Sequence, residues 1–327
     1  MLRPAALTAA LLWCIYAALP AAARRPPLCS TADFDGTRPS YVAVFSAFPA
    51  ELVPLLATTD VEETVEIDGR LFFVGRMAGV HVVLSLLGIG MVNARESTER
   101  MLARFDVAGI VVSGVAGSQH NIGDVVIAQS WVETGRRRVW KVNPALLALA
   151  ERTAPRLPEP FQRCTPVPPT DPEAPLVCME HEPALVFEAR GESGDPFGGN
   201  ALPCLPGGGE VLGCEIPAAL AAARAPVPID LVDQETAAVT RLAATRRVPM
   251  IGVRGVSDGA GDPKGFRPFP LQFFDYYRLA AFNAAVVTRA IVAELGAIAT
   301  DPAAERICRR LARRRWRSAA DLILSAP

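Results

Sequence analysis

The stretch GVRGVSDGAG, residues 252–261, begins as an apolar strand and passes into a run of glycines. Asp258 lies where this strand is expected to end. An aspartate at such a point can form a turn, because its side chain bonds to nearby backbone. It can also be an acid held at the rim of a sheet, and the neighbouring segments must decide between the two.

Apolar strands and helical patterns alternate on both sides of this stretch. Strand-length apolar runs lie at 41–48, 80–87, 107–114 and 248–257, and helical patterns at 49–57, 91–105, 235–247 and 275–297. Residues 69–88 read as a hairpin with Ala78 and Gly79 at its turn. This alternation predicts an α/β fold in which helices cover a sheet.

The two ends of the chain differ from this pattern. Residues 1–23 combine Arg3, an apolar run and a small-residue end at Ala23, which predicts a secretory signal peptide. An uncleaved anchor is the alternative; after cleavage, no stable membrane insertion is expected, and the protein would be secreted or periplasmic. Residues 24–40 are expected to be irregular. The basic amphipathic tail, residues 301–327, fits a surface helix, or a contact with a membrane surface or an anionic partner.

Composition and cysteine usage restrict the function classes. The formal net charge of −1 gives no general attraction to nucleic acid. Of seven cysteines, all but Cys14 follow the signal peptide, and an even number in an exported chain suggests disulfides. The pairs expected from their positions are Cys164–Cys178, Cys204–Cys214 and Cys29–Cys308, among other pairings that the sequence allows. Zinc is less suited, because no C-x-x-C occurs. Residues 151–215, rich in Pro, Gly and Cys, are expected to form an irregular, disulfide-stapled insertion.

Acidic residues and glycine turns are expected to meet at one edge of the sheet. Glu51 and Asp258 follow strands, as do the glycine turns at 88–90 and 114–117. Glu235 begins the helix that leads back into the last strand, so it lies at the same edge. If the strands are parallel, all of these residues face one crevice. Each carboxylate alone could instead complement a helix dipole or shape a turn.

Four segments resemble signature blocks of the nucleoside phosphorylase superfamily. They are LGIGMVNA (87–94), VVSGVAGSQHNIGDVVI (111–127), VDQETAAV (232–239) and VRGVSDGAG (253–261). The nearest branch resembles the methylthioadenosine/S-adenosylhomocysteine nucleosidases, and residues 123–135 are similar to secreted, storage-protein-like members. The resemblance implies a single α/β domain over residues 41–300, with a mixed, curved central sheet flanked by helices. It also implies small-molecule nucleoside substrates, no metal, no organic cofactor, and pairing into a homodimer.

The resemblance also implies a role for each matching residue. Glu51 would activate water, and Asp258, held by Ser257, would protonate the leaving purine at N7. Glu235 would bind the ribose hydroxyls. The remaining matching positions lie beside the sugar and the nucleophile: Gln234, Gly114 and Val115. Two carboxyl groups on opposite sides of a glycosidic bond are the arrangement of inverting glycosidases.

Departures from the family pattern leave base preference and activity open. The usual stacking phenylalanine is expected to fall at Leu212, followed by Gly213, and leucine cannot stack as an aromatic ring does. Phe187 or Phe197 could replace it. Glutamate at position 51 disfavours phosphate, although Arg95 could still reach an anion, so phosphorolysis remains an alternative to hydrolysis. A nucleoside-binding or storage-like protein without catalysis is a third hypothesis.

Overall fold

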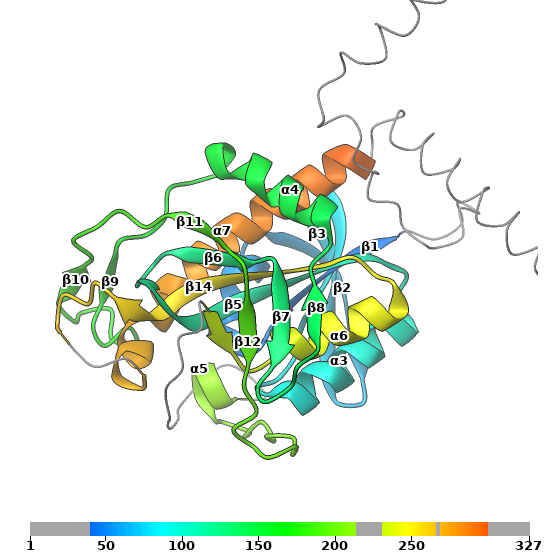
Figure 1. The fold of residues 1–327 in the computed structure, drawn as a ribbon, viewed down its shortest axis with the longest axis horizontal. Coiled ribbons are helices and arrows are strands. Elements are labelled where there is room, and N and C mark those ends of the chain that lie inside the picture. Colours follow the sequence, from blue (N-terminus) through cyan, green and yellow to red (C-terminus); the bar gives the residue numbers. More distant parts are fainter. Residues whose placement is uncertain (1–39, 214–230, 266–268, 300–327) are drawn as a thin grey trace, which may run out of the picture.

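The computed structural model describes residues 40–213, 231–265 and 269–299, whose strands form a 12-stranded mixed sheet and a separate two-stranded hairpin (Figure 1). The helices are α2 Pro49–Leu56, α3 Met91–Arg104, α4 Pro144–Thr153, α5 Gly209–Leu212, α6 Thr236–Arg246 and α7 Leu271–Ala299, with a 3-10 turn at Ala154–Arg156. The strands are β1 Tyr41–Ser46, β2 Thr59–Ile67, β3 Arg70–Met77, β4 Val80–Leu86, β5 Val107–Asn121, β6 Val125–Ala128, β7 Ser130–Glu133, β8 Val139–Lys141, β9 Cys164–Pro166, β10 Leu176–Cys178, β11 Leu185–Glu188, β12 Gly191–Ser193, β13 Leu231–Asp233 and β14 Met250–Ala260. The predicted signal peptide, the tail, Cys29, Cys214 and Cys308 lie outside the described residues.

The central strands β4, β1, β5 and β14 are parallel neighbours, as the sequence predicted. Val44 of β1 pairs with Leu84 on one side and with Val111 on the other, and Val111 pairs with Ile251 of β14. Parallel strands end at the same edge of a sheet. The residues that follow β1 and β4 therefore lie at the edge reached by the last residues of β14.

Both faces of this sheet are covered, which explains why its strands read as continuous apolar runs. In β1, Val42 and Val44 belong to an apolar core that includes Val287 of α7. Ala43 and Phe45 point the other way, into a core shared with α3 and α6. The helices therefore fix the sheet from opposite sides.

Helix α7 is the long closing helix that the sequence predicted. It packs along β14 and β5. By length and composition, Leu271–Gly296 could also span a membrane, but 67% of its most apolar window is buried within the fold. Its apolar character is therefore accounted for by packing on the sheet.

The hairpin β3–β4 is confirmed, with its turn at Ala78 and Gly79. Both residues have positive φ, 50° and 78°, which suits the twist of a two-residue hairpin turn. Strand β2, which the sequence analysis did not predict, pairs with β3. Most of its residues are exposed, so it lacks the apolar run that identified the other strands.

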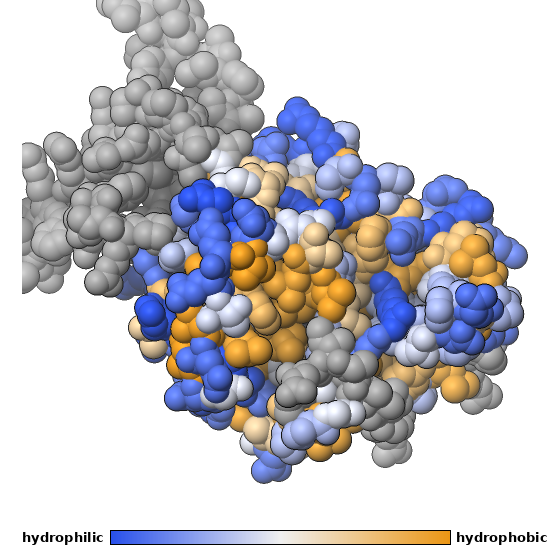
Figure 2. Space-filling view, turned by 180° about the vertical axis from the view of Figure 1, so that it is seen from behind, coloured by the Kyte–Doolittle hydropathy of each residue, from blue (hydrophilic) through white to orange (hydrophobic). Residues whose placement is uncertain are grey.

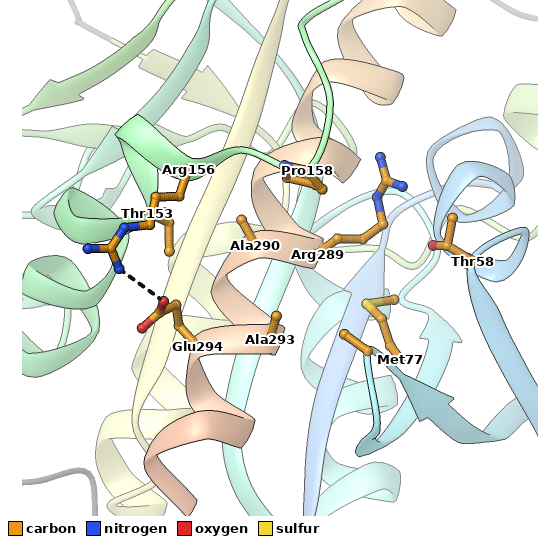
Figure 3. A pocket seen from close by; sticks show the side chains of 10 residues that line it. Thr58, Met77, Thr153, Arg156, Pro158, Arg289, Ala290, Ala293 and Glu294 are labelled. Atoms are coloured by element: carbon orange, nitrogen blue, oxygen red, sulfur yellow. Dashed lines mark ion pairs between the residues drawn. The ribbon is translucent and has the colours of Figure 1, made fainter.

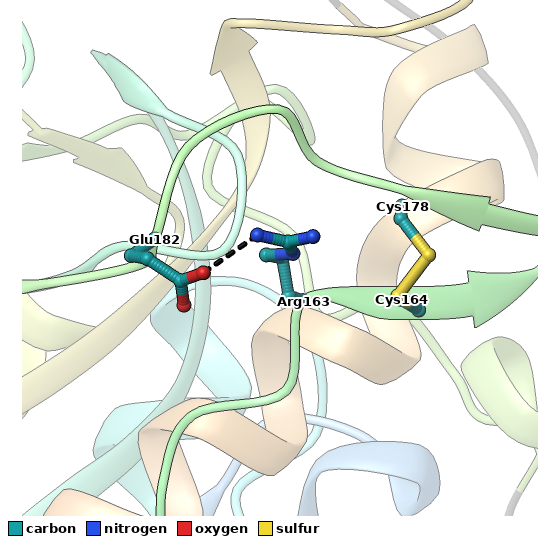
Figure 4. The surroundings of a disulfide bond; sticks show 4 residues. All are labelled: Arg163, Cys164, Cys178 and Glu182. Carbon is teal, nitrogen blue, oxygen red and sulfur yellow. Dashed lines mark hydrogen bonds and ion pairs between the residues drawn. A yellow bond between two sulfur atoms is a disulfide. The ribbon is translucent and has the colours of Figure 1, made fainter.

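The expectation of an irregular insertion at residues 151–215 is wrong for four of its segments: β9 and β10 pair with each other, and β11 and β12 join the main sheet. β11 pairs with β6, and β12 pairs with both β7 and β13 inside the main sheet. These strands have only four and three residues, too few to show a period in the sequence. The predicted disulfide Cys164–Cys178 is present, and it joins β9 to β10 across a separation of 14 residues (Figure 4). Cys204 is also disulfide-bonded.

Apolar side chains gather in the middle of the face opposite to that of Figure 1, with polar side chains around them (Figure 2). Exposed apolar residues of the described chain include Val53 on α2, Leu271 on α7 and Phe269 just before it. The homodimer that the family resemblance implies stays a prediction.

Candidate active site

Glu51 is buried in the first turn of α2, directly after β1. Its side chain is 1% exposed, and its two oxygens accept three backbone N–H groups: Oε2 from Ala47 (2.6 Å) and Phe48 (3.4 Å), and Oε1 from Val115 (2.7 Å). Burial raises the pKa of Glu51 to about 7, although Arg254 and the three N–H donors act to lower it. The carboxyl group can therefore gain or lose a proton near neutral pH.

Glu235 lies at the N-cap of α6 and is 4% exposed. Its Oε1 accepts a hydrogen bond from the Gly90 N–H (3.0 Å), and its Oε2 lies 3.4 Å from Nη2 of Arg254. Burial raises its pKa to about 8; Arg254 opposes this rise, while Asp233 and Glu51 add to it. The predicted turn at 88–90 and the predicted helix start therefore meet.

Arg254 is the fully buried cation of this cluster, and the sequence analysis missed it. Its guanidinium lies 2.8 Å from Asp233, 3.4 Å from Glu235 and 3.8 Å from Glu51, and Nη2 and Nε donate to Thr236 Oγ1 at 2.8 and 3.1 Å. Burial alone would lower the pKa of Arg254, but the three carboxylates outweigh it and raise that pKa. The available signal was an arginine in the middle of an apolar strand, since such a charge is almost never buried without partners.

Asp233 connects Arg254 to the segment that was expected to be irregular. It accepts hydrogen bonds from the hydroxyls of Ser193 on β12 and of Thr236, in addition to its ion pair with Arg254. Ser193 Oγ in turn accepts the Ala237 N–H at 2.7 Å. Strand β12 therefore supports the start of α6 directly and Arg254 through Asp233.

The glycines at 114 and 117 do not form the predicted turn, because β5 continues through both. A Cβ at Gly114 would lie 2.4 Å from Glu51 Oε1 and 2.4 Å from Arg254 Nη1, and a Cβ at Gly117 would lie 2.6 Å from Asp258 Oδ2. These positions are glycine because side chains from other elements occupy the space of a Cβ. Val115, between them, is buried and binds Glu51 through its backbone.

Asp258 also lies within a strand and not after one, since β14 continues to Ala260. The pairing with β5 is irregular on both sides of Asp258, which is opposite Gly117. Ser257 Oγ donates to Asp258 Oδ1 at 2.8 Å; burial raises the pKa of Asp258, and this bond lowers it. Gly117 is three residues along β5 from Gly114, a distance of about 10 Å at the usual strand rise. Glu51 and Asp258 therefore contact β5 at two points about 10 Å apart along the strand.

Three other predicted site residues lie apart from the contacts around Arg254: Gln234, Leu212 and Gly213. Gln234, between Asp233 and Glu235, has a buried Oε1 that accepts no hydrogen bond from the described residues. Leu212 O accepts the Leu205 N–H, and Leu205 also bridges to Gly213. From α5, it is Val211 that packs against the apolar cluster of Val115 and Phe48.

Of the two phenylalanines considered as replacements, Phe197 lies beside the site. A Cβ at Gly90 would lie 2.8 Å from the Phe197 ring, so this ring rests on the peptide whose N–H binds Glu235. Phe187, on β11, packs against the main apolar core. The aromatic candidate near the carboxylates is therefore Phe197.

A cavity of about 390 Å³ lies elsewhere, against the C-terminal half of α7 (Figure 3). It is lined by Met77 and Ala78 from the β3–β4 turn, and Arg156 pairs with Glu294 at 3.8 Å on its other side. Ala78 precedes β4, whereas Gly90 follows it, so the cavity is at the opposite edge of the sheet. Within the part of the chain that the structure describes, no group of three His, Cys, Asp or Glu side chains is placed to hold a metal ion.

Comparison with known proteins identifies the family of the chain and supports its fold. The family model described as the phosphorylase superfamily matches residues 41–177. An uncharacterized protein of Mycobacterium tuberculosis is 34% identical over 212 residues, which cover 56% of this chain and 82% of the relative. The chain belongs to the phosphorylase superfamily. A 5′-methylthioadenosine/S-adenosylhomocysteine nucleosidase of Marinomonas sp. is 28% identical over 253 residues, 76% of this chain and 96% of that protein.

Solved structures of the phosphorylase superfamily fold support the architecture alone. The nucleosidase of Neisseria meningitidis, in complex with methylthio-immucillin-A, has a TM-score of 0.53 at 22% identity and covers 78% of this chain and 99% of that one. The futalosine hydrolase of Helicobacter pylori has a TM-score of 0.54 at 19% identity, and the match covers 77% of this chain and 97% of that one. The mixed sheet flanked by helices is thus confirmed.

Proposed function

We propose that this phosphorylase-superfamily protein hydrolyses the N-glycosidic bond of a purine nucleoside related to methylthioadenosine or adenosine. The observation that carries the proposal is the convergence of Glu51 and Glu235 on buried Arg254. Arg254 pairs with Gly114 of β5 and Asp258 pairs with Gly117, about 10 Å further along that strand. Glu51 and Glu235 are buried and Asp258 is half-buried, and burial raises the pKa of all three; carboxyl groups with raised pKa values cluster at functional sites.

The proposed reaction uses one carboxyl group on each side of the sugar. Glu51, as the carboxylate, takes a proton from water as the water oxygen bonds to C1′. The bond from C1′ to N9 breaks, its electron pair goes to the purine, and Asp258 gives its proton to N7. The products are the free sugar and the neutral base.

Glu235 serves a different purpose in this scheme. One of its oxygens is fixed by the Gly90 N–H and the other by Arg254, which leaves lone pairs for the ribose 2′ and 3′ hydroxyls. In its ionised form, its charge also favours the positive sugar that develops as the bond breaks.

Phe197 replaces Leu212 in the proposal as the side chain that stacks on the purine. Its ring lies against Gly90, next to the peptide that holds Glu235. Asp195 fixes its loop by accepting the N–H groups of Phe197 (3.2 Å) and Gly199 (2.6 Å). The loop is therefore ordered enough to present an aromatic surface.

Hydrolysis is favoured over phosphorolysis because the nucleophile side of the site is acidic. Arg95, the candidate phosphate ligand, is 43% exposed, and its Nη2 lies 3.9 Å from Glu96 Oε1. The guanidinium of Arg254 is already shared among carboxylates. Both arginines are poorly suited to cradle a phosphate.

The test is release of free base from a panel of purine nucleosides, with and without inorganic phosphate. We expect equal rates in both conditions, and loss of release in Asp258→Asn and Glu51→Gln. Glu62→Gln, an exposed substitution on β2, is the control and should be fully active. A strict phosphate requirement would establish the phosphorylase instead. Binding of nucleosides without any release would favour the storage-like alternative.

Export, which the Cys164–Cys178 disulfide supports, is tested by the N-terminal sequence of the mature protein.

A further inference from the structure

The backbone around Asp258 is held by α7 and not by regular strand pairing. The pairing of β14 with β5 shifts register before and after Asp258. The N–H of the next residue, Gly259, instead donates to Oε1 of Gln272, at 2.9 Å. Gln272 is in the first turn of α7 and is 2% exposed. A bulge of this kind re-aims a side chain, but its direction must then be fixed by other contacts.

Further contacts tie the same segment to α7. Gln272 Nε2 lies 3.5 Å from Oδ2 of Asp262, and the hydroxyl of Tyr276 donates to Asp262 Oδ1 at 2.5 Å. A Cβ at Gly259 would lie 2.2 Å from the His120 carbonyl oxygen, so β5 closes the opposite side. The peptide after Asp258 is therefore clamped between a helix and a strand.

We propose that Gln272 is a positioning residue: by accepting the Gly259 N–H, it fixes the peptide that follows Asp258 and aims this carboxyl group at the leaving base. This rests on the proposed function, since it assigns to Asp258 the role of acid. Gln272 has no place in the proton transfers themselves. Without the carbonyl oxygen of Gln272, the half-buried N–H of Gly259 loses its acceptor, and the backbone shifts toward water to replace it.

Two consequences separate positioning from general support of the fold. The acid becomes misplaced, which slows only reactions that need a proton on the leaving group. It also becomes more hydrated, and since burial is what raises its pKa, that pKa falls. Other titratable or charged groups near this segment are Asp262 and Lys264 on the loop, Asp275 and Tyr276 on α7, His181 against Gly261, and the His120–Glu188 pair.

The experiment compares Gln272→Met with Asn283→Leu. Asn283 is a matched control because it is a fully buried amide on the same helix, where it donates to the carbonyls of Gly123 and Gln162. Both variants are assayed with a purine nucleoside and with 4-nitrophenyl riboside, whose leaving group departs without protonation. Thermal unfolding and a profile of kcat/KM against pH are recorded for each.

For Gln272→Met we expect kcat/KM on the nucleoside to fall roughly 10- to 100-fold, the scale of a misplaced catalytic group. Cleavage of the aryl riboside should stay near the wild-type rate, and the limb of the pH profile that reports ionisation of Asp258 should move to lower pH. Asn283→Leu should lower the unfolding temperature and change neither the substrate ratio nor the pH limb. Equal losses on both substrates, or an unmoved limb, would overturn the positioning role. Wild-type protein that releases no base would instead refute the proposed function.

Discussion

Replacing Glu51 with glutamine should flatten the pH dependence of stability, because it removes a carboxyl group that burial holds at a pKa of about 7 against an ordinary 4.5. The folded-state pKa is the higher one, so the contribution of Glu51 to stability is complete below about pH 4.5 and is lost as the pH rises through about 7. One pKa unit corresponds to 1.36 kcal/mol. With these two values, Glu51 alone lowers the free energy of unfolding by about 2.5 kcal/mol between about pH 5 and pH 8.

The glutamine variant also has a constant cost. Its single carbonyl oxygen cannot accept from both the Ala47 and the Val115 N–H groups, which now bind different oxygens of Glu51. A buried N–H left without an acceptor costs about 1–3 kcal/mol at every pH. The informative quantity is therefore the difference in slope and not the stability at one pH.

The assay is urea unfolding, followed by tryptophan fluorescence, at a series of pH values from about 5 to 8. Wild-type protein should lose about 2.5 kcal/mol more than Glu51→Gln across this range. The exposed substitution Glu62→Gln should follow the wild-type slope. Parallel curves for wild type and Glu51→Gln would refute the assignment of a raised pKa to Glu51, and with it the argument for its proton-accepting role.

Three further predictions concern activity. The kcat/KM for purine release should pass through a maximum with pH, because release needs Glu51 ionised and Asp258 protonated; a flat profile would contradict this pairing. Gly114→Ala places a Cβ 2.4 Å from a Glu51 oxygen and should abolish activity and cost about 1–3 kcal/mol in urea unfolding. Gly109→Ala on the same strand, whose Cβ meets its nearest atom at 3.7 Å, should be tolerated; similar losses in both variants would argue against the close packing at the site. Phe197→Ala should raise KM about tenfold or more through lost stacking, with an unchanged unfolding temperature. An unchanged KM would show that Phe197 does not stack on the base.

The long apolar segments were predictable because burial on both faces of a parallel sheet leaves a local pattern. β1, β4 and β14, with the helices between them, could be located from that pattern alone. Short strands such as β12 could not, since three residues carry no period and are fixed only by pairing with β7 and β13.

The sequence by itself determined the alternation of strands and helices, and from this alternation it predicted one sheet edge for Glu51, Glu235 and Asp258. Tertiary structure alone decided how they are held. Arg254 is paired with Asp233 and not left as a buried free cation, and Gly114 and Gly117 make room for side chains from other elements and do not form a turn. The physical reason is that hydrophobic period is a property of neighbouring residues. Ion pairs and close packing, by contrast, join groups far apart along the chain, and only the folded chain brings their atoms together.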